Sequence, residues 1–236
     1  MDSQKINHAY YAFISATIIT SLVISLFFLV EPRVTRSAVV DTSGPFTITQ
    51  TITGETAFLV DAANVTMVPV GGSVDGLTGG EAFGTTTFSV RSNNNAGYFV
   101  DIDFADPDLT GVAMSGVNTG SDAIANYNLG VSADYNFSTA QPNAVFAFTV
   151  DSLNPGDTHS TFLSTGSTCG SGTDEAGRCW IGPSTTAPIR IVSRDETTSS
   201  ATTSIIFRVY VPSGADPVVP VDTYVATATL SLLEQI

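Results

Sequence analysis

A charge-free segment near the N-terminus, residues 9–30, constrains this chain more than any other feature. It reads AYYAFISATIITSLVISLFFLV, and a helix that crosses the hydrocarbon core of a bilayer needs about 20 mostly apolar residues. A buried helix of a globular domain is the competing interpretation, but such helices are usually shorter than a bilayer span. The segment therefore predicts a membrane-inserting helix that exports or anchors the rest of the chain.

The sequence leaves open whether this segment is cleaved as a signal peptide or retained as an anchor. Lys5 is the only firm positive charge before it, and its apolar core is long for a signal peptide. A cut after Ala38 would also leave Arg36 where a small residue is expected. These features favour a retained anchor. We expect residues 1–38 to form the leader or anchor with its connector, and residues 39–236 to form one exported domain.

The charge of the exported region limits its partners. Residues 39–236 hold five arginines, no lysine and 20 acidic residues, a net charge of −15. Such a surface repels nucleic acid and anionic lipid, so we expect neither as a partner. The absence of lysine also removes Schiff-base chemistry from this region. Disorder is the competing interpretation of an acidic chain, but 43% of all residues are hydrophobic, enough to build a core.

Short segments that alternate apolar and polar residues fill most of the exported region. In TSIIFRVYVP, for example, Ile205, Phe207 and Val209 fall on one face of an extended chain. Gly, Pro and Asn separate the segments, and residues 105–143 read mostly as loop. Eight or nine short strands with such turns predict an antiparallel β-sandwich. The predicted strands lie within residues 45–60, 64–70, 85–92, 97–104, 144–150, 188–193, 203–212 and 223–233.

The C-terminal hairpin carries a generic resemblance. A turn that contains proline, GADPVVPVD, leads into the segment TYVATATL at residues 223–230. This region, within Thr202–Leu233, resembles the closing strands of immunoglobulin-like modules of exported cell-surface proteins. The resemblance implies an all-β, antiparallel immunoglobulin-like β-sandwich after the N-terminal helix, and it carries no functional residue. An antibody-type domain is excluded, because the cysteine pair between sheets and the core tryptophan are missing.

The two cysteines, Cys169 and Cys179, bracket the short segment GSGTDEAGR. In an exported chain, so close a pair predicts a local disulfide that stiffens a surface loop. A zinc or redox site is not indicated, because the pair lacks C-x-x-C spacing and a neighbouring histidine.

Four carboxylates gather in the segment DIDFADPD, at Asp101, Asp103, Asp106 and Asp108. Calcium takes six to eight oxygen ligands, which clustered aspartates and loop carbonyls can supply, so the segment is a candidate calcium site. The EF-hand pattern is absent. A solvated acidic edge that discourages pairing between sheets is the competing interpretation.

A catalytic site is not indicated by the sequence. His159 has Asp157 and Ser160 beside it, but neighbours in sequence rarely supply the geometry of a Ser-His-Asp triad, and a nucleophile-elbow motif is missing. The spacing of the carboxylates does not single out a pair for glycoside hydrolysis. We therefore expect a protein that is not an enzyme.

Two hypotheses for function follow. The first is an extracellular structural or adhesive subunit that self-associates by β-strand addition, with Phe46, Ile48 and Ile52 on one face of the donated strand. Pairing of that strand within its own domain is the alternative. The second is a surface-tethered carbohydrate-binding module, in which exposed aromatic side chains, above all Trp180 and Tyr210, would contact a glycan. Further aromatic candidates for that role are Phe99, Tyr127 and Tyr135.

Overall fold

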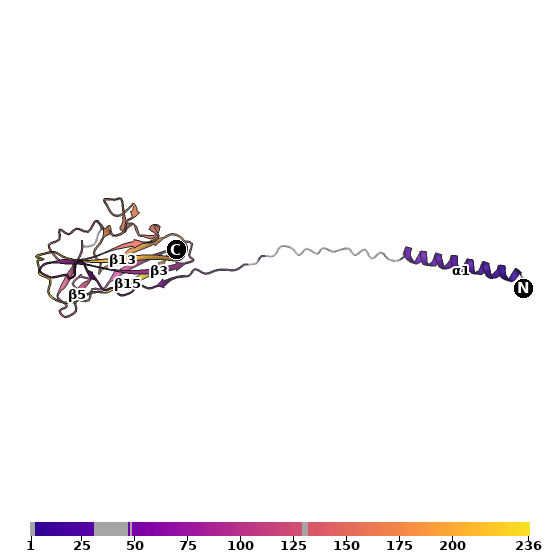
Figure 1. The fold of residues 1–236 in the computed structure, drawn as a ribbon, viewed down its shortest axis with the longest axis horizontal. Helices are drawn as coiled ribbons and strands as arrows, with labels where there is room; N and C mark the ends of the chain where they lie inside the picture. The colour runs from indigo at the N-terminus through magenta and orange to yellow at the C-terminus, as the bar shows by residue number, and fades with distance from the viewer. Residues whose placement is uncertain (1–2, 31–46, 48, 129–131) are drawn as a thin grey trace. The chain divides into compact units, whose positions relative to one another are not determined.

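The computed structural model describes residues 3–30, 47, 49–128 and 132–236 (Figure 1). Side chains are described throughout these ranges except at residues 3–7, 9, 27–30 and 155. The chain divides into two compact units, Met1–Gln50 and Thr51–Ile236, and each is described by itself.

In the described part of the first unit, residues 3–30 form the helix α1 (Ser3–Val30), which agrees with the predicted N-terminal helix. Within the part of the chain that the structure describes, no helix has both the length and the apolar character needed to cross a bilayer. The membrane crossing predicted for residues 9–30 is therefore not found, although residue 9 and residues 27–30 are among those without described side chains.

The second unit is all β, and its main sheet is built around one long strand. Strand β13 (Thr198–Val211) pairs antiparallel with β3 (Gly80–Ser92) on one side and with β8 (Val145–Ser152) on the other. Further strands extend the sheet at both ends, and β6 joins β8 in parallel. The remaining strands of this sheet are β1 (Thr56–Val60), β2 (Val68–Pro69), β5 (Met114–Gly116), β6 (Ala123–Asn126) and β14 (Tyr224–Ala226).

A smaller antiparallel sheet has the order β12-β4-β15. Its strands are β12 (Ile189–Arg194), β4 (Tyr98–Phe104) and β15 (Ala228–Glu234). Two short ladders lie outside both sheets. One joins β9 (Leu163–Ser164) to β10 (Thr173–Asp174), and the other joins β7 (Asp134–Tyr135) to β11 (Cys179–Trp180). Two 3-10 turns, η1 (Pro155–Asp157) and η2 (Ser160–Phe162), follow β8.

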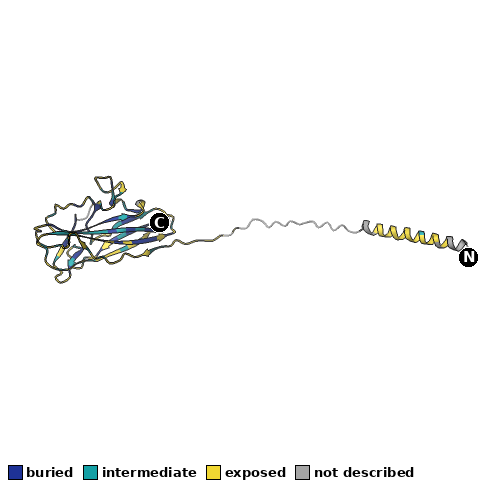
Figure 2. Cartoon of the chain, in the orientation of Figure 1, coloured by how far each residue is buried: buried dark blue, intermediate teal, exposed yellow. Residues whose placement is uncertain are grey.

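Both sheets contribute to the larger of two hydrophobic clusters, and Tyr127, Phe137 and Trp180 belong to the smaller one (Figure 2). Because alternate residues of a strand face the same side, the period-two pattern of β4 buries Val100, Ile102 and Phe104. The ring of Phe104 lies 6.2 Å from that of Phe146 and 5.4 Å from that of Phe148, both on β8. Burying each such side chain stabilises the fold by about 1.5–3 kcal/mol, so the alternating strands determine which faces meet.

The predicted all-β, mainly antiparallel fold is confirmed, whereas the immunoglobulin-like arrangement is not. The main sheet continues through β6, β5 and β14 beyond a parallel pairing. The prediction of mostly loop over residues 105–143 is wrong in part, since β5, β6 and β7 lie there. These strands are only two to four residues long and arise from pairing with distant segments, which local periodicity cannot reveal.

The first predicted strand begins later than expected. Strand β1 starts at Thr56, and the described residues 47 and 49–55 are in no strand. Phe46 and Ile48 lie outside the described residues. Ile52 is 81% exposed, so its apolar face is not buried as alternation suggested.

Candidate functional site

Two of the four aspartates of the candidate calcium site, Asp101 and Asp106, have partners within the protein. The Asp101 carboxylate accepts a hydrogen bond from Nε of Arg190 at 2.9 Å, and that guanidinium lies 3.8 Å from the ring centre of Phe99. Asp106 closes the turn after β4 by accepting from the backbone N–H groups of residues 110 and 111, at 3.0 and 2.9 Å. Across the described residues, no group of three or more histidine, cysteine or acidic side chains is arranged to hold a metal ion. The structure therefore does not bring Asp101, Asp103, Asp106 and Asp108 together as a calcium site.

The residues around His159 do not form a triad. The Asp157 carboxylate forms two hydrogen bonds with Nη1 of Arg194, at 2.6 and 2.8 Å, and both side chains are largely buried. His159 instead caps the N-terminus of η2, and its Nδ1 atom lies 3.0 Å from the hydroxyl oxygen of Thr161. Burial lowers the pKa of His159, and the nearby Arg190 lowers it further. Asp157 therefore fixes an arginine and does not orient the histidine.

The proposed glycan residue Trp180 is buried. Only 4% of it is exposed, and its indole N–H donates to the carbonyl of Gly177 at 2.8 Å. Its ring packs edge-on against Phe83 and Phe137. Tyr210 is half-buried and packs against Phe137, with ring centres 6.0 Å apart. Neither residue offers the open aromatic face that the carbohydrate hypothesis requires.

The other aromatic candidates are engaged as well. Tyr127 is fully buried and donates from its hydroxyl to Asp134 at 2.9 Å. Phe99 lies under Arg190, and Tyr135 is half-buried with its hydroxyl 3.4 Å from Glu175.

Arg208 is the centre of this aromatic cluster, which we call the Arg208 cluster and which consists of Arg208, Phe83, Phe137, Trp180 and Tyr210. The guanidinium lies 4.1 Å from the ring centre of Phe137 and 5.0 Å from that of Phe83. Glu81 pairs with it at 2.5 Å. A cation held over several rings, with a carboxylate beside it, fixes the chain segments that carry those rings against β13.

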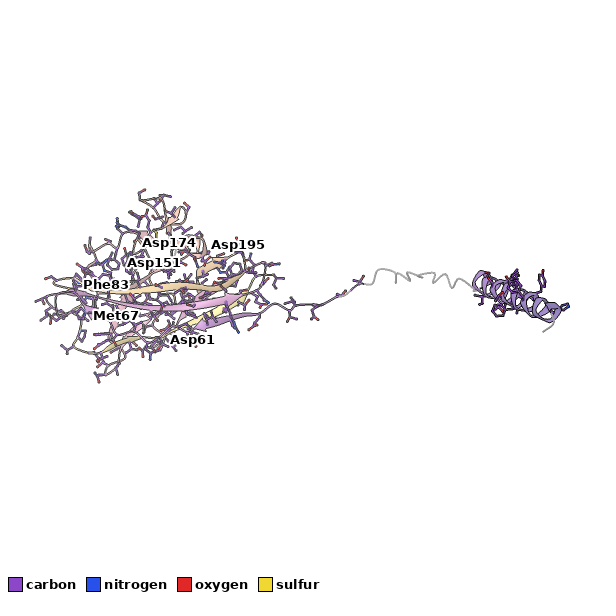
Figure 3. All side chains as sticks on the ribbon, turned by 45° about the vertical axis from the view of Figure 1, so that its right-hand side comes forward. Asp61, Met67, Phe83, Asp151, Asp174 and Asp195 are labelled. Carbon is purple, nitrogen blue, oxygen red and sulfur yellow. A yellow bond between two sulfur atoms is a disulfide. The ribbon has the colours of Figure 1, made fainter. Side chains whose placement is uncertain are left out.

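The predicted disulfide is confirmed, since Cys169 and Cys179 are bonded. The disulfide closes a hairpin, and the chain that follows it lies beside the edge of β8, where Ile181 exchanges two backbone hydrogen bonds with Phe148, at 2.9 and 3.0 Å. Asp174 ties the same hairpin down by accepting from the hydroxyl of Thr158 and from a backbone N–H. Figure 3 labels Asp174 on this side of the main strands, with Met67 and Asp61 on the other side.

That other side exposes the edge of the smaller sheet. Strand β15 is the last strand of the order β12-β4-β15, and its sequence ATLSLLE carries a single charge, at Glu234. Natural edge strands are usually blunted by lysine, proline or a bulge, because an open edge offers unpaired N–H and C=O groups to other strands. The pairing of β15 with β4 runs through seven residues without a shift of register. This edge is therefore regular, uncharged over most of its length and open to another strand.

An apolar cavity of about 240 Å³ lies beside the start of β15. It forms because the pairing along β3 is interrupted there. Strand β1 pairs with β3 as far as Ser89, and β2 pairs with β3 from Phe83. The segment that connects β1 to β2 bulges away from β3. The hydroxyl of Thr86 holds this bulge through two hydrogen bonds with the backbone of Ala63, both 2.9 Å. The apolar lining comes from both sheets and includes Val65, Met67, Ile102, Phe207, Ala228 and Leu230.

A second cavity of about 410 Å³ adjoins the first and shares Met67, Met114 and Tyr224 with it. Apolar side chains that line the two cavities remain open, with Val225 48% exposed and Val221 fully exposed. We call these two cavities with the free edge of β15 the β15 groove. Sequence reasoning missed this groove, because its walls come from segments more than 100 residues apart and neither segment is unusual by itself.

The predicted assembly strand is only partly within the described chain. Of its three inner-face residues, Ile52 alone is described, and it is exposed. The residues after it are fixed to the turn between β3 and β4. The side chain of Asn93 donates to the carbonyl of Thr53 at 3.2 Å and accepts from the N–H of Glu55 at 2.5 Å.

Comparison with known proteins adds no further constraint, since no protein-family model, curated protein or solved structure matches this chain.

Proposed function

We propose that this protein is a non-enzymatic structural or adhesive subunit of a cell envelope or surface filament, whose copies associate by β-strand addition. The observation that carries the proposal is the β15 groove: a regular, nearly uncharged sheet edge beside an apolar cavity. Strand addition uses such an edge, because main-chain hydrogen bonds supply affinity and alternate side chains enter pockets.

An extracellular location belongs to the same proposal. A short-range disulfide between the only two cysteines is stable in oxidising compartments and rare in the cytosol. The lysine-free, acidic composition and the hydroxyl-rich strands are typical of exported β-proteins. Residues 1–38 would supply the leader or anchor, and the β domain would be a variant of the immunoglobulin-like sandwich with a bent main sheet.

Protease treatment of intact cells tests the location. We expect the β domain to be cut or released from intact cells that express the full chain, and a cytoplasmic control protein to be spared. Full protection of the β domain until the cells are lysed would contradict the proposal.

A further inference from the structure

We propose that the β15 groove accepts residues 46–53 of a second copy of this chain, which add as a strand to the free edge of β15. The inference rests on the proposed function and names the acceptor, the donor and the partner. Phe46, Ile48 and Ile52 would project into the groove, while the threonines between them face solvent.

The acceptor has the apolar character that such a strand requires. Ala228 and Leu230 project from β15 into the smaller cavity, so a neighbouring strand would place alternate side chains in the same space. Val225 and Val221 are left exposed in the lining of the groove. Covering apolar surface stabilises a complex by about 25 cal/mol for each Å² removed from water.

The donor matches this acceptor in length. The segment FTITQTIT has eight residues, or about 26 Å as an extended strand, and the seven residues of β15 span about 23 Å. Its four even positions hold Phe46, two isoleucines and the polar Gln50, and its odd positions are all threonine. A strand with this alternation needs an apolar surface on one side, and the described Ile52 is without one.

Charge favours this contact over others between copies. The chain has a net charge of −14, so two copies repel each other over most of their surfaces. The donor segment is uncharged, and β15 carries only Glu234 at its end. A contact between the donor segment of one copy and β15 of the other therefore avoids most of the repulsion between the two negatively charged copies.

Geometry indicates a second copy and not the same chain. To lie along its own β15, the donor would have to reverse direction between Thr53 and Thr56. Asn93 bonds to the carbonyl of Thr53 and, through both side chain and backbone, to Glu55, while Arg91 pairs with the Glu55 carboxylate at 2.6 Å. These bonds hold Glu55 in line with β1 at the end of β3, so a tight reversal there would break them.

Mixed cysteine cross-linking of the full chain tests the inference. The two native cysteines are bonded to each other, so an introduced cysteine is the only free thiol. One preparation carries Ile48→Cys and the other carries Ala228→Cys, an exposed position that lines the cavity. After mixing and mild oxidation, we expect disulfide-linked dimers that contain one copy of each variant. Phe46→Cys and Ile52→Cys replace Ile48→Cys in parallel experiments, which test alternative registers of the donor strand against β15.

Thr47→Cys is the matched control, because it lies on the opposite face of the donor. Its cross-linking to Ala228→Cys should be at least about tenfold lower, since Cβ atoms that point apart cannot be bridged.

If polymers form but Phe46→Cys, Ile48→Cys and Ile52→Cys all fail to cross-link, the inference is wrong and the proposed function stands. If the full chain is monomeric at every concentration, both fail. A lipid or other small apolar molecule found in the purified protein by native mass spectrometry, without cross-linking, would assign the groove to that ligand instead.

Discussion

The two sides of the main sheet differ in how their apolar surface is covered. On one side, the Arg208 cluster covers β8 and β13, and the chain that follows the disulfide-closed hairpin pairs with the edge of β8, leaving Trp180 4% exposed. On the other side, the β15 groove leaves Val225 48% exposed and an edge strand unguarded. One chain has thus sealed one surface with a disulfide, a partly buried ion pair and four rings, while the other surface stays open. The contrast suggests that the sealed side supplies stability and the open side supplies association.

The largest effect on stability is expected from Trp180→Ala on the sealed side. Removing a buried indole leaves a cavity beside Phe83 and Phe137, which costs about 3–5 kcal/mol in the free energy of unfolding. Trp180→Phe should cost clearly less, because a ring remains. Urea denaturation measures both variants. A loss below about 1 kcal/mol for Trp180→Ala would show that the Arg208 cluster contributes little to stability.

Removal of the disulfide should follow in size. The double substitution Cys169→Ser with Cys179→Ser releases a loop with a sequence separation of 10, and about 2–3 kcal/mol of stability should be lost. The same urea titration measures this loss. Self-association of the folded variant should persist, because the hairpin lies on the sealed side. Loss of association at a temperature where the variant is still folded would break the proposed division between the two sides.

Lysine on the open edge should change association and barely change stability. Ser231→Lys places a charge on β15, and Ser200→Lys, at an exposed position of β13 in the main sheet, is the control. Both should alter the free energy of unfolding by no more than about 0.5 kcal/mol. Only Ser231→Lys should raise the protein concentration at which sedimentation velocity detects oligomers. Equal behaviour of the two variants would contradict the assignment of β15 as the acceptor.

The smallest effect is a pH dependence on the sealed side. Burial raises the pKa of Asp174, although hydrogen bonds from Thr158 and Ser152 oppose the shift. The folded state therefore binds this proton more tightly than the unfolded state, and lowering the pH through the folded pKa should favour folding. Relative to Asp174→Asn, the wild-type melting temperature should improve between pH 7 and pH 4. Asp195→Asn, at an exposed position, controls for the loss of one charge. A constant difference in melting temperature would contradict the shift.

Period-two alternation predicted the strands that build the core. The segments 97–104 and 203–212 contain β4 and most of β13, because their alternating residues face one buried side. The disulfide followed from two close cysteines in an exported chain. In contrast, β1 starts later than its alternation suggested, because the residues before Thr56 lie at the end of β3, where Asn93 holds Thr53 and Glu55.

The surroundings of the predicted site residues depend on partners that are distant in the sequence. Asp101 looked like a calcium ligand, but its partner Arg190 is 89 residues away. Trp180 looked exposed beside a loop cysteine, but Phe137 and Arg208 cover it. The β15 groove depends on how the chain after β1 bulges from β3, and local sequence patterns do not encode that pairing. A signal that could have suggested it is the near absence of charge in β15.

Light scattering by residues 39–236 across a concentration series tests the central claim most directly. This fragment contains the whole compact unit Thr51–Ile236 with its core, so it is suited to study in solution. The account predicts growth into polymers, and a monomer at every concentration when residues 46–53 are deleted. A fragment that is monomeric with residues 46–53 present, or polymers that persist without them, would contradict it.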